Sequence, residues 1–155
     1  MTQEDKELLL QDLCGRIPYG VKMNHIADTE NNPITLVGVA KTMITLESFA
    51  GYGTSDIGDY IPYLFPLSSM TEAQKKEFKE ISKCEYKIRN YGGFDSEGVY
   101  LIEIGSYEYE HDINTDFEEF YFNHEIINWL NKNHFDYRGL IEKGLAINAT
   151  GLNIY

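Results

Sequence analysis

The sequence predicts a single α+β domain over residues 1–155, with a mostly antiparallel sheet and about three helices packed at its face and ends. Three segments place apolar residues at helical spacing behind N-capping side chains. Several others concentrate β-branched and aromatic residues between loop signals, as strands do. A chain of 155 residues with 43% hydrophobic residues is long enough to bury the core that such elements need.

The first helix is predicted over residues 3–15. Thr2 and Asp5 have the spacing of a capping box. Apolar residues then recur on one helical face: Leu9, Leu10, Leu13, Cys14 and Ile17. Cys14 and Cys84 are too few for a disulfide framework, so we expect two reduced thiols, with Cys14 on the buried stripe.

The middle of the chain is expected to be mainly extended. Residues 21–27 and 34–42 are predicted strands, separated by the loop residues "DTENNP", and 43–48 continue as extended structure. The glycine-rich residues 49–59, "FAGYGTSDIGD", are predicted to be a flexible loop. Residues 60–69 contain Pro62 and Pro66, which argue against a helix interior or a central strand. We therefore expect this segment to lie extended over the core.

The second half contains two more predicted helices and the clearest strand signal. Thr71 and Gln74 form a capping box ahead of a surface helix over 71–83, in which Glu72 can pair with Lys76. Residues 98–113 alternate as a strand does, and a change of phase at Gly105 predicts a bulge or a sharp bend. The last helix is expected over 124–134. Its N-cap is Asn123 and its buried face consists of Ile126, Trp129 and Leu130.

The net charge of −12 is concentrated in one part of the chain. Residues 90–130 contain ten acidic residues and no Lys or Arg. Direct binding of nucleic acid is disfavoured, because phosphate contacts come from Lys and Arg. We expect an acidic surface made of Glu103, Glu108, Glu110, Asp112, Asp116, Glu118 and Glu119.

The segment "FNHEIINWLNKNHFDYR", residues 122–138, resembles a zinc-protease helix but lacks an essential ligand. His124 and Glu125 fit the pattern, whereas the second histidine, one turn later, is replaced by Asn128. His134 lies at the offset of a third ligand, but all four methionines precede the helix, so no Met-turn follows. We expect no metal here, and we interpret His134 as a cation at the helix C-terminus, where the helix dipole favours it.

Two other patterns carry little chemistry. Glu108, Glu110 and Asp112 could face a hard cation together, but ligands two residues apart on a strand are too widely spaced, and a solvated face is the expected role. The segment "GYGTSDIG" has no Lys-Ser or Lys-Thr pair after its glycines, so it does not predict a phosphate site. The sequence predicts no cofactor.

The segment after the last helix, "HFDYRG", supports two interpretations. In the first it ends the helix structurally: Phe135 and Leu140 are buried, Gly139 turns the chain, and Arg138 caps carbonyls or pairs with Asp136 or an upstream carboxylate. In the second it binds a ligand. The candidate binding residues are then Trp129, His134, Asp136, Tyr137 and Arg138.

Three segments carry a resemblance to known proteins: "DLCGRIPYGVK" (12–22), "YIPYLFPLSSMTEAQKKE" (60–77) and "WLNKNHFDYRGLIEKGLA" (129–146). They resemble a family of small proteins from gut anaerobic bacteria and their phages and mobile elements. That family has no assigned activity, cofactor or catalytic residue. The resemblance implies a cytoplasmic protein of phage or mobile-element origin, and it does not extend to the acid-rich strand.

The N-terminus has no signal-type apolar stretch, and no run is long enough to span a bilayer, so we expect a cytoplasmic protein without membrane contact. Without an intact catalytic motif, the sequence favours a non-enzymatic binding or accessory protein. Its acidic surface would engage a basic protein partner, and in the sharper version it would mimic nucleic acid. The alternatives are a small enzyme with a site assembled near the last helix and a homo-oligomeric structural component. The sequence leaves the oligomeric state open.

Overall fold

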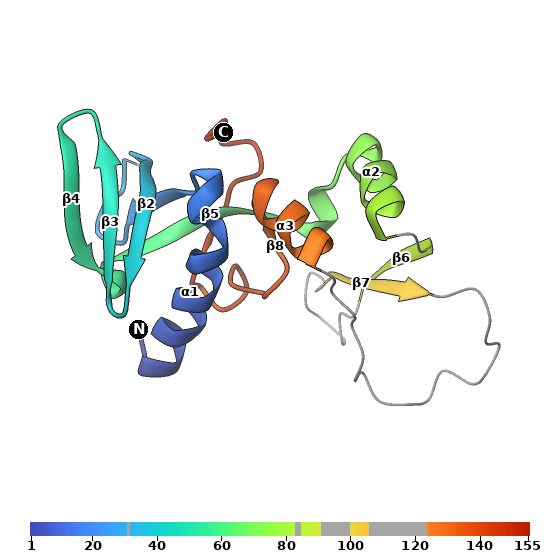
Figure 1. Cartoon of the computed structure of the whole chain (residues 1–155), viewed down its shortest axis with the longest axis horizontal. Helices are drawn as coiled ribbons and strands as arrows, with labels where there is room; N and C mark the ends of the chain where they lie inside the picture. The colour runs from blue at the N-terminus through green and yellow to red at the C-terminus, as the bar shows by residue number, and fades with distance from the viewer. Residues whose placement is uncertain (31, 83–84, 91–99, 106–123) are drawn as a thin grey trace. The chain divides into compact units, whose positions relative to one another are not determined.

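The computed structural model describes residues 1–30, 32–82, 85–90, 100–105 and 124–155 (Figure 1). Two compact units are present. The first unit comprises Met1–Pro66 and Leu130–Tyr155, and the second unit comprises Leu67–Trp129. The expectation that residues 1–155 form a single domain stays a prediction.

The first unit begins with helix α1, Gln3–Arg16, which starts at the predicted capping box. The Thr2 hydroxyl accepts a hydrogen bond from the backbone N–H of Asp5 at 3.1 Å. In return, the Asp5 carboxylate accepts one from the N–H of Thr2 at 2.9 Å. The first bond satisfies a donor that an isolated helix start leaves free. The helix continues into a short 3-10 turn, η1, Ile17–Tyr19.

The buried face of α1 differs from the predicted apolar stripe. Leu9 and Leu13 are fully buried as expected, but Cys14 is exposed, so its predicted burial was wrong. Asp12 and Arg16 are fully buried instead. Helical spacing alone could not show this, because a charged pair one turn apart can enter a core when its members neutralise each other.

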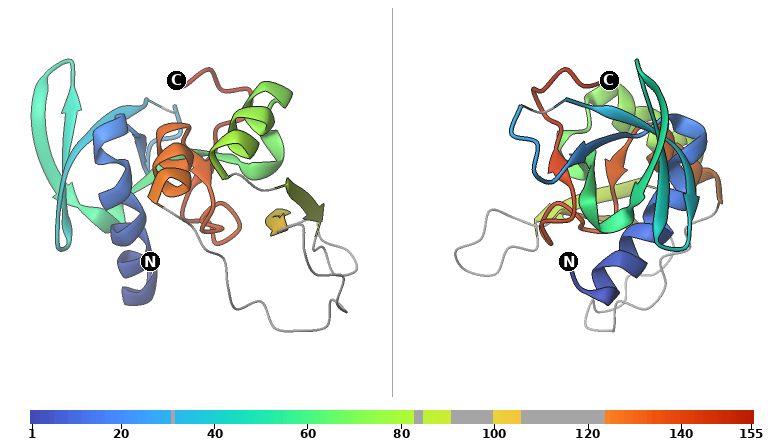
Figure 2. Two further views of the ribbon diagram at one scale, coloured as in Figure 1. Left: turned by 45° about the vertical axis from the view of Figure 1, so that its right-hand side comes forward. Right: turned by 90° about the vertical axis from the view of Figure 1, so that its left-hand side faces the viewer.

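A seven-stranded sheet forms the centre of the first unit (Figures 1 and 2). Its order is β4-β3-β2-β1-β5-β8, and β9 also pairs with β5. Neighbouring strands are antiparallel except where β5 pairs with β8 and β9 in parallel. The strands are β1 Lys22–His25, β2 Ile34–Ala40, β3 Met43–Ser48, β4 Gly51–Asp56, β5 Tyr60–Pro66, β8 Phe135–Asp136 and β9 Ile147–Asn148. The predicted strands over 21–27, 34–42 and 43–48 are confirmed.

The hydrophobic core of the first unit joins α1 to the sheet and to the C-terminal segment. Its fully buried members come from all three parts of the fold: Leu9, Leu13, Val21, Met23, Leu36, Ile44, Ile57, Leu64 and Leu140. Burial of this apolar surface is the main favourable term for the unit. The C-terminal residues are therefore part of the core rather than an appended tail.

Residues 51–56 form strand β4, where the sequence predicted a flexible loop over 49–59. All of its residues pair with β3, from Gly51 opposite Ser48 to Asp56 opposite Met43. A short 3-10 turn, η2, Ile57–Asp59, follows the strand. The glycines suggested a loop, but Gly51 has a φ of +112°, a conformation that glycine adopts more readily than other residues. Such a conformation suits the tight connection of a hairpin. The loop prediction was therefore wrong.

Strand β5 lies inside the sheet, although its prolines argued against an inner strand. The N–H of Ile26 donates to the carbonyl of Asp59 at 2.9 Å, and hydrogen-bonded pairs alternate along an antiparallel ladder. By this alternation, Met23 of β1 and Pro62 of β5 form a pair that exchanges no hydrogen bonds, so β1 needs no N–H donor from Pro62. On the other side of β5, β9 begins to pair only at Tyr63. The expectation of a non-central strand was wrong because the neighbours of Pro62 do not need its missing N–H.

The second unit contains η3, Leu67–Ser69, helix α2, Glu72–Ser82, and the antiparallel strands β6, Glu85–Asn90, and β7, Tyr100–Gly105. The predicted capping box starts α2, since the N–H of Gln74 donates to the Thr71 hydroxyl at 3.3 Å and the N–H of Thr71 donates to the Gln74 amide oxygen at 2.9 Å. Glu72 forms an ion pair with Lys75 at 2.6 Å, one residue before the expected Lys76.

Helix α3, His124–Lys132, begins in the second unit and ends in the first. Ile126, Trp129 and Leu130 are buried, as predicted. Within the second unit, the Trp129 ring packs edge-on against Phe78 with centroids 5.4 Å apart. The predicted N-cap Asn123 lies outside the described residues, as do all residues from 106 to 123, so the bulge stays a prediction.

The described residues thus form an α+β fold with three α-helices and a mostly antiparallel sheet, as the sequence predicted. Among these residues, no helix has the length and apolar character needed to cross a membrane.

The close approach of α1 to Asn131 makes Gly15 a test of this packing. A Cβ at Gly15 would lie 2.7 Å from the Nδ2 atom of Asn131, whose residue is 1% exposed. Alanine usually stabilises a helix interior relative to glycine by ~0.5–1 kcal/mol. We expect the reverse for Gly15→Ala, a loss of ~1–3 kcal/mol in the free energy of unfolding, because the clash outweighs helix propensity. Urea denaturation measures this change.

The matched control is the same substitution in an Asn131→Ala background. There the obstructing amide is absent, so we expect Gly15→Ala to be neutral or stabilising, which gives a coupling free energy between the two sites. If Gly15→Ala stabilises both backgrounds equally, the close contact between α1 and Asn131 is wrong.

Candidate functional site

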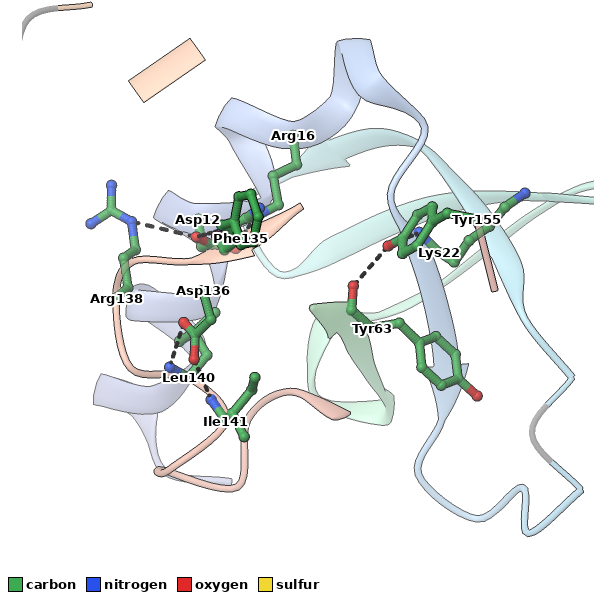
Figure 3. A network of polar contacts seen from close by, with 10 residues as sticks. All are labelled: Asp12, Arg16, Lys22, Tyr63, Phe135, Asp136, Arg138, Leu140, Ile141 and Tyr155. Atoms are coloured by element: carbon green, nitrogen blue, oxygen red, sulfur yellow. Dashed lines mark hydrogen bonds and ion pairs between the residues drawn. The ribbon is translucent and has the colours of Figure 1, made fainter. Parts of the chain in front are cut away.

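A buried ion pair within α1 is the centre of the polar network in the first unit (Figure 3). The Nε atom of Arg16 donates to Asp12 Oδ2 at 2.6 Å, and Nη2 donates to Asp12 Oδ1 at 2.9 Å. Both side chains are fully buried. Nη2 also donates to the carbonyl of Phe135 at 2.8 Å. The pair therefore binds α1 directly to strand β8, 119 residues later in the chain.

Arg138 and Tyr137 extend this network towards the surface. The Nε atom of Arg138 lies 3.5 Å from Asp12 Oδ1, and its side chain is 32% exposed. The Cζ atoms of Arg16 and Arg138 lie 5.4 Å and 5.2 Å from the centre of the Tyr137 ring, within the range of cation–π attraction. Asp12 thus interacts with two guanidinium groups. The expectation that Arg138 pairs with an upstream carboxylate is met by Asp12 rather than by Asp136.

The Asp136 carboxylate closes the turn that follows β8. Oδ1 accepts a hydrogen bond from the N–H of Leu140 at 2.9 Å, and Oδ2 accepts one from the N–H of Ile141 at 2.8 Å (Figure 3). Gly139 has a φ of +69° within this turn, and Leu140 is fully buried. These features match the structural interpretation of "HFDYRG". Both carboxylate oxygens are engaged by backbone donors.

His134 is buried against the ring of Tyr155. The two rings stack with centroids 3.9 Å apart and an interplanar angle of 13°. Burial, together with the positive charges of Arg16 and Lys22, lowers the pKa of His134 from 6.5 to about 4. The imidazole is therefore neutral near pH 7, and the interpretation of His134 as a helix-terminal cation is wrong. The cost of desolvating a charge outweighs the attraction of the helix dipole.

Tyr155 fixes the C-terminal residue to the sheet. Its hydroxyl donates to the carbonyl of Tyr63 at 2.7 Å and accepts a hydrogen bond from the N–H of Lys22 at 3.1 Å (Figure 3). Burial raises the pKa of the Tyr155 phenol. One hydroxyl therefore bridges the chain segments that carry β1 and β5.

The structure brings together only part of the predicted binding set. Arg138 lies beside Asp12 and Tyr137 lies beside Arg16, whereas Asp136 closes the turn that follows β8 and His134 immediately precedes β8. Trp129 belongs to the second unit, where it packs against Phe78. The ligand-binding interpretation of these residues stays a prediction.

Sequence reasoning missed Asp12 and Arg16 as members of this network. The available signal was an acid and a base four residues apart on the face of α1 that carries Leu9 and Leu13. Such a pair is usually solvent-exposed, so the spacing by itself did not predict burial.

Most of the predicted acidic surface lies outside the described residues. This applies to Glu108, Glu110, Asp112, Asp116, Glu118 and Glu119, and with them to the proposed cation face. Glu103 lies in β7, where its Cα is paired with that of Lys87 in β6. Within the part of the chain that the structure describes, no group of three or more His, Cys, Asp or Glu side chains could hold a metal ion.

A cavity of about 610 Å³ opens in the first unit, away from this network. Its lining includes the apolar residues Ile26, Ile61, Leu145 and Ile147. Asp5 and Asp28 also line it, but hydrogen bonds from the backbone N–H groups of Thr2 and Glu30 lower the pKa values of these carboxyls. Both acids therefore stabilise the helix start and the loop through these hydrogen bonds.

No protein-family model, curated protein sequence or solved structure matches this chain. The three segments on which the expected resemblance rests all contribute polar groups to the first unit: residues 12–22 supply Asp12 and Arg16, residues 60–77 supply Tyr63, and residues 129–146 supply Asp136 and Arg138. The resemblance itself stays an expectation.

The network serves mainly to hold the fold. Asp12 and Asp136 accept short hydrogen bonds from groups of the protein, and His134 is neutral and stacked. Arg138 is the partly exposed charge, so a ligand at this site would meet its guanidinium first. An anionic group would be the natural match for that side chain.

The buried ion pair predicts a strong dependence of stability on either partner. Arg16→Met leaves the Asp12 carboxylate buried with its main counter-charge removed, so we expect a loss of ~3–5 kcal/mol in the free energy of unfolding. The double variant Asp12→Leu with Arg16→Met should be far less destabilised than either single variant. Chemical denaturation of all three variants measures the coupling.

Arg138→Ala is the matched control for this series. Its guanidinium is one-third exposed and lies farther from Asp12, so its removal should cost less than ~1 kcal/mol. An Arg16→Met variant as stable as Arg138→Ala would contradict the buried pair.

The lowered pKa of His134 predicts that this residue destabilises the fold in acid. Between pH 6.5 and about 4 the unfolded chain binds a proton that the folded protein excludes, so stability falls as the pH falls through this window. The full contribution is roughly 3 kcal/mol, from about 1.4 kcal/mol for each pKa unit. His134→Asn tolerates the φ of +57° at this position and removes the titration.

We therefore expect the stability of the wild type to fall more steeply than that of His134→Asn between pH 7 and 4.5. Urea midpoints at both pH values measure the difference. The carboxyl groups titrate in both proteins, so their contribution cancels in the comparison. Parallel pH profiles would show that His134 does not titrate below its ordinary range.

Proposed function

We propose that this protein is a non-enzymatic binding or accessory protein that acts inside the cell and engages a basic protein partner through residues 90–130. One observation carries the proposal: this segment has ten acidic residues and no Lys or Arg. An intracellular role of phage or mobile-element origin is what the sequence resemblance implies, and it belongs to the same proposal.

The division of charge between the two units supports this assignment. The first unit has 11 acidic and 7 basic residues, a net charge of −4, whereas the second unit has 14 and 6, a net charge of −8. The first unit also neutralises charge internally, through the Asp12–Arg16 and Asp56–Lys6 ion pairs. The unbalanced charge is therefore greatest in the unit that contains the acid-rich segment.

Such a segment favours a partner of opposite charge. Clustered carboxylates repel one another, and a basic surface would relieve that repulsion while it accelerates association by electrostatic steering. The interaction should weaken as salt screens it over a Debye length of about 8 Å at physiological ionic strength. In the sharper form of the proposal, the carboxylates take the place of phosphates in the groove of a nucleic-acid-binding protein.

The chemistry near the last helix is better suited to structure than to catalysis. A general acid or base needs a reachable proton and a pKa near the working pH. His134 is buried with its pKa lowered to about 4, and Asp136 is bound by two backbone donors. These contacts favour the binding proposal over the alternative of a small enzyme at this site.

A competition experiment tests the proposal. The protein is immobilised and exposed to a bacterial lysate at low salt, and bound proteins are then eluted with duplex DNA or with high salt. We expect basic nucleic-acid-binding proteins to be retained and to be released by both treatments. A variant with Glu108→Gln, Glu110→Gln and Asp112→Asn should retain several-fold less of them, because it lacks three of the proposed phosphate-like charges.

The matched control removes three charges from the first unit. Glu4, Glu7 and Glu30 are exposed, so their replacement by Gln changes the net charge equally without touching residues 90–130. This control should retain the same proteins as the wild type. If both triple variants lose binding equally, net charge is responsible rather than the acid-rich segment. Absence of any basic protein at low salt would remove the proposal.

A further inference from the structure

Strand β4, Gly51–Asp56, is the last strand of the sheet in the first unit. It pairs with β3 on one side, and no strand among the described residues pairs with its other side (Figures 1 and 2). An edge strand presents a row of unpaired N–H and C=O groups, which is a template for adding another strand.

The register identifies the groups that face this open edge. The N–H of Ile57 donates to the carbonyl of Thr42 at 2.7 Å, in register with the β3–β4 ladder. Hydrogen-bonded pairs alternate in an antiparallel ladder, so Gly53 and Ser55 face β3. The N–H and C=O groups of Tyr52, Thr54 and Asp56 therefore point away from the sheet.

This edge lacks the usual protection against strand addition. Proteins commonly blunt an edge with lysine, proline or a bulge, whereas residues 49–56 contain neither lysine nor proline, and β3 pairs with β4 without a register shift. The side chain of Tyr52 is 73% exposed, and Phe49 at the adjoining turn is fully exposed. The edge is accordingly open, and it exposes an aromatic ring.

The charge of the edge selects its occupant. Residues 48–55 contain no charged side chain, although the chain carries a net charge of −12. The Asp56 carboxylate forms an ion pair with Lys6 at 2.7 Å, so its negative charge is largely neutralised within the same copy. A basic protein gains no attraction at such a strand. A second copy finds a neutral strand opposite its own, with hydrogen-bonding groups that are self-complementary in the antiparallel direction.

We propose that this edge is a homodimer interface, in which β4 pairs antiparallel with β4 of a second copy about a two-fold axis at Thr54. Thr54 then lies opposite Thr54 of the second copy, and Tyr52 lies opposite Asp56. The outward N–H and C=O groups of these residues exchange hydrogen bonds across the axis. Tyr52 and Thr54 share one face, so each Tyr52 ring lies diagonally next to the Thr54 of the other copy.

This association has a salt dependence opposite to that of partner binding. Two copies of net charge −12 repel each other at long range, and salt screens that repulsion. The dimer should therefore become tighter as the salt concentration rises, whereas binding of a basic protein becomes weaker. The interface also does not involve residues 90–130, so the dimer and the proposed function can fail separately.

Charge-swap variants at Thr54 test the proposal. The mass of the full chain is measured by light scattering over a range of concentrations at high salt. We expect the measured mass of the wild type to rise to twice that of one copy as the concentration increases. Thr54→Lys and Thr54→Glu should each remain at the mass of one copy, because like charges meet at the axis. An equimolar mixture of the two variants should regain the doubled mass, because Lys and Glu then face each other.

Thr150→Lys is the matched control, since Thr150 is exposed and lies outside β4. It should keep the wild-type mass, and thermal unfolding should show that all Thr54 variants fold as the wild type does. A wild type that keeps the mass of one copy at every concentration overturns the proposal. A dimer that persists in Thr54→Lys also overturns it, because the interface would then lie elsewhere.

Discussion

The buried pair of Asp12 and Arg16 is the constraint on which the first unit depends. Two fully buried charges require each other, and the Nη2 atom of Arg16 also donates to the carbonyl of Phe135. The pair therefore does more than neutralise itself, because it fixes where strand β8 meets α1. The turn closed by Asp136 and the core residue Leu140 follow from that position.

Several polar groups near the last helix are engaged in this arrangement. Asp136 accepts two backbone hydrogen bonds, His134 is stacked on Tyr155, and the Tyr155 hydroxyl bridges Lys22 and Tyr63. The residues that look most reactive in the sequence are those that hold the C-terminal segment in the core. Unbalanced charge is concentrated instead in the second unit, whose net charge is −8, and this imbalance is the physical basis for proposing a basic partner.

Local signals were reliable where one short segment contained the whole cause. Thr2 with Asp5 and Thr71 with Gln74 start helices because each pair satisfies its own backbone donors. Glycine and proline gave wrong predictions of strand position, because whether a strand tolerates them depends on the neighbouring strand. Gly51 serves a hairpin rather than a loop, and Pro62 is tolerated inside the sheet because β1 requires no donor there.

The sequence by itself determined the α+β class, the three helices of the described residues and the segregation of acidic residues, because spacing, capping and charge are properties of short stretches of chain. Only the tertiary structure decided that Asp12 and Arg16 are buried, that His134 is neutral and that β4 ends the sheet with an open edge. Burial, pKa and strand pairing depend on groups far apart in the chain. Their free energies arise only when folding removes water and brings those groups into contact.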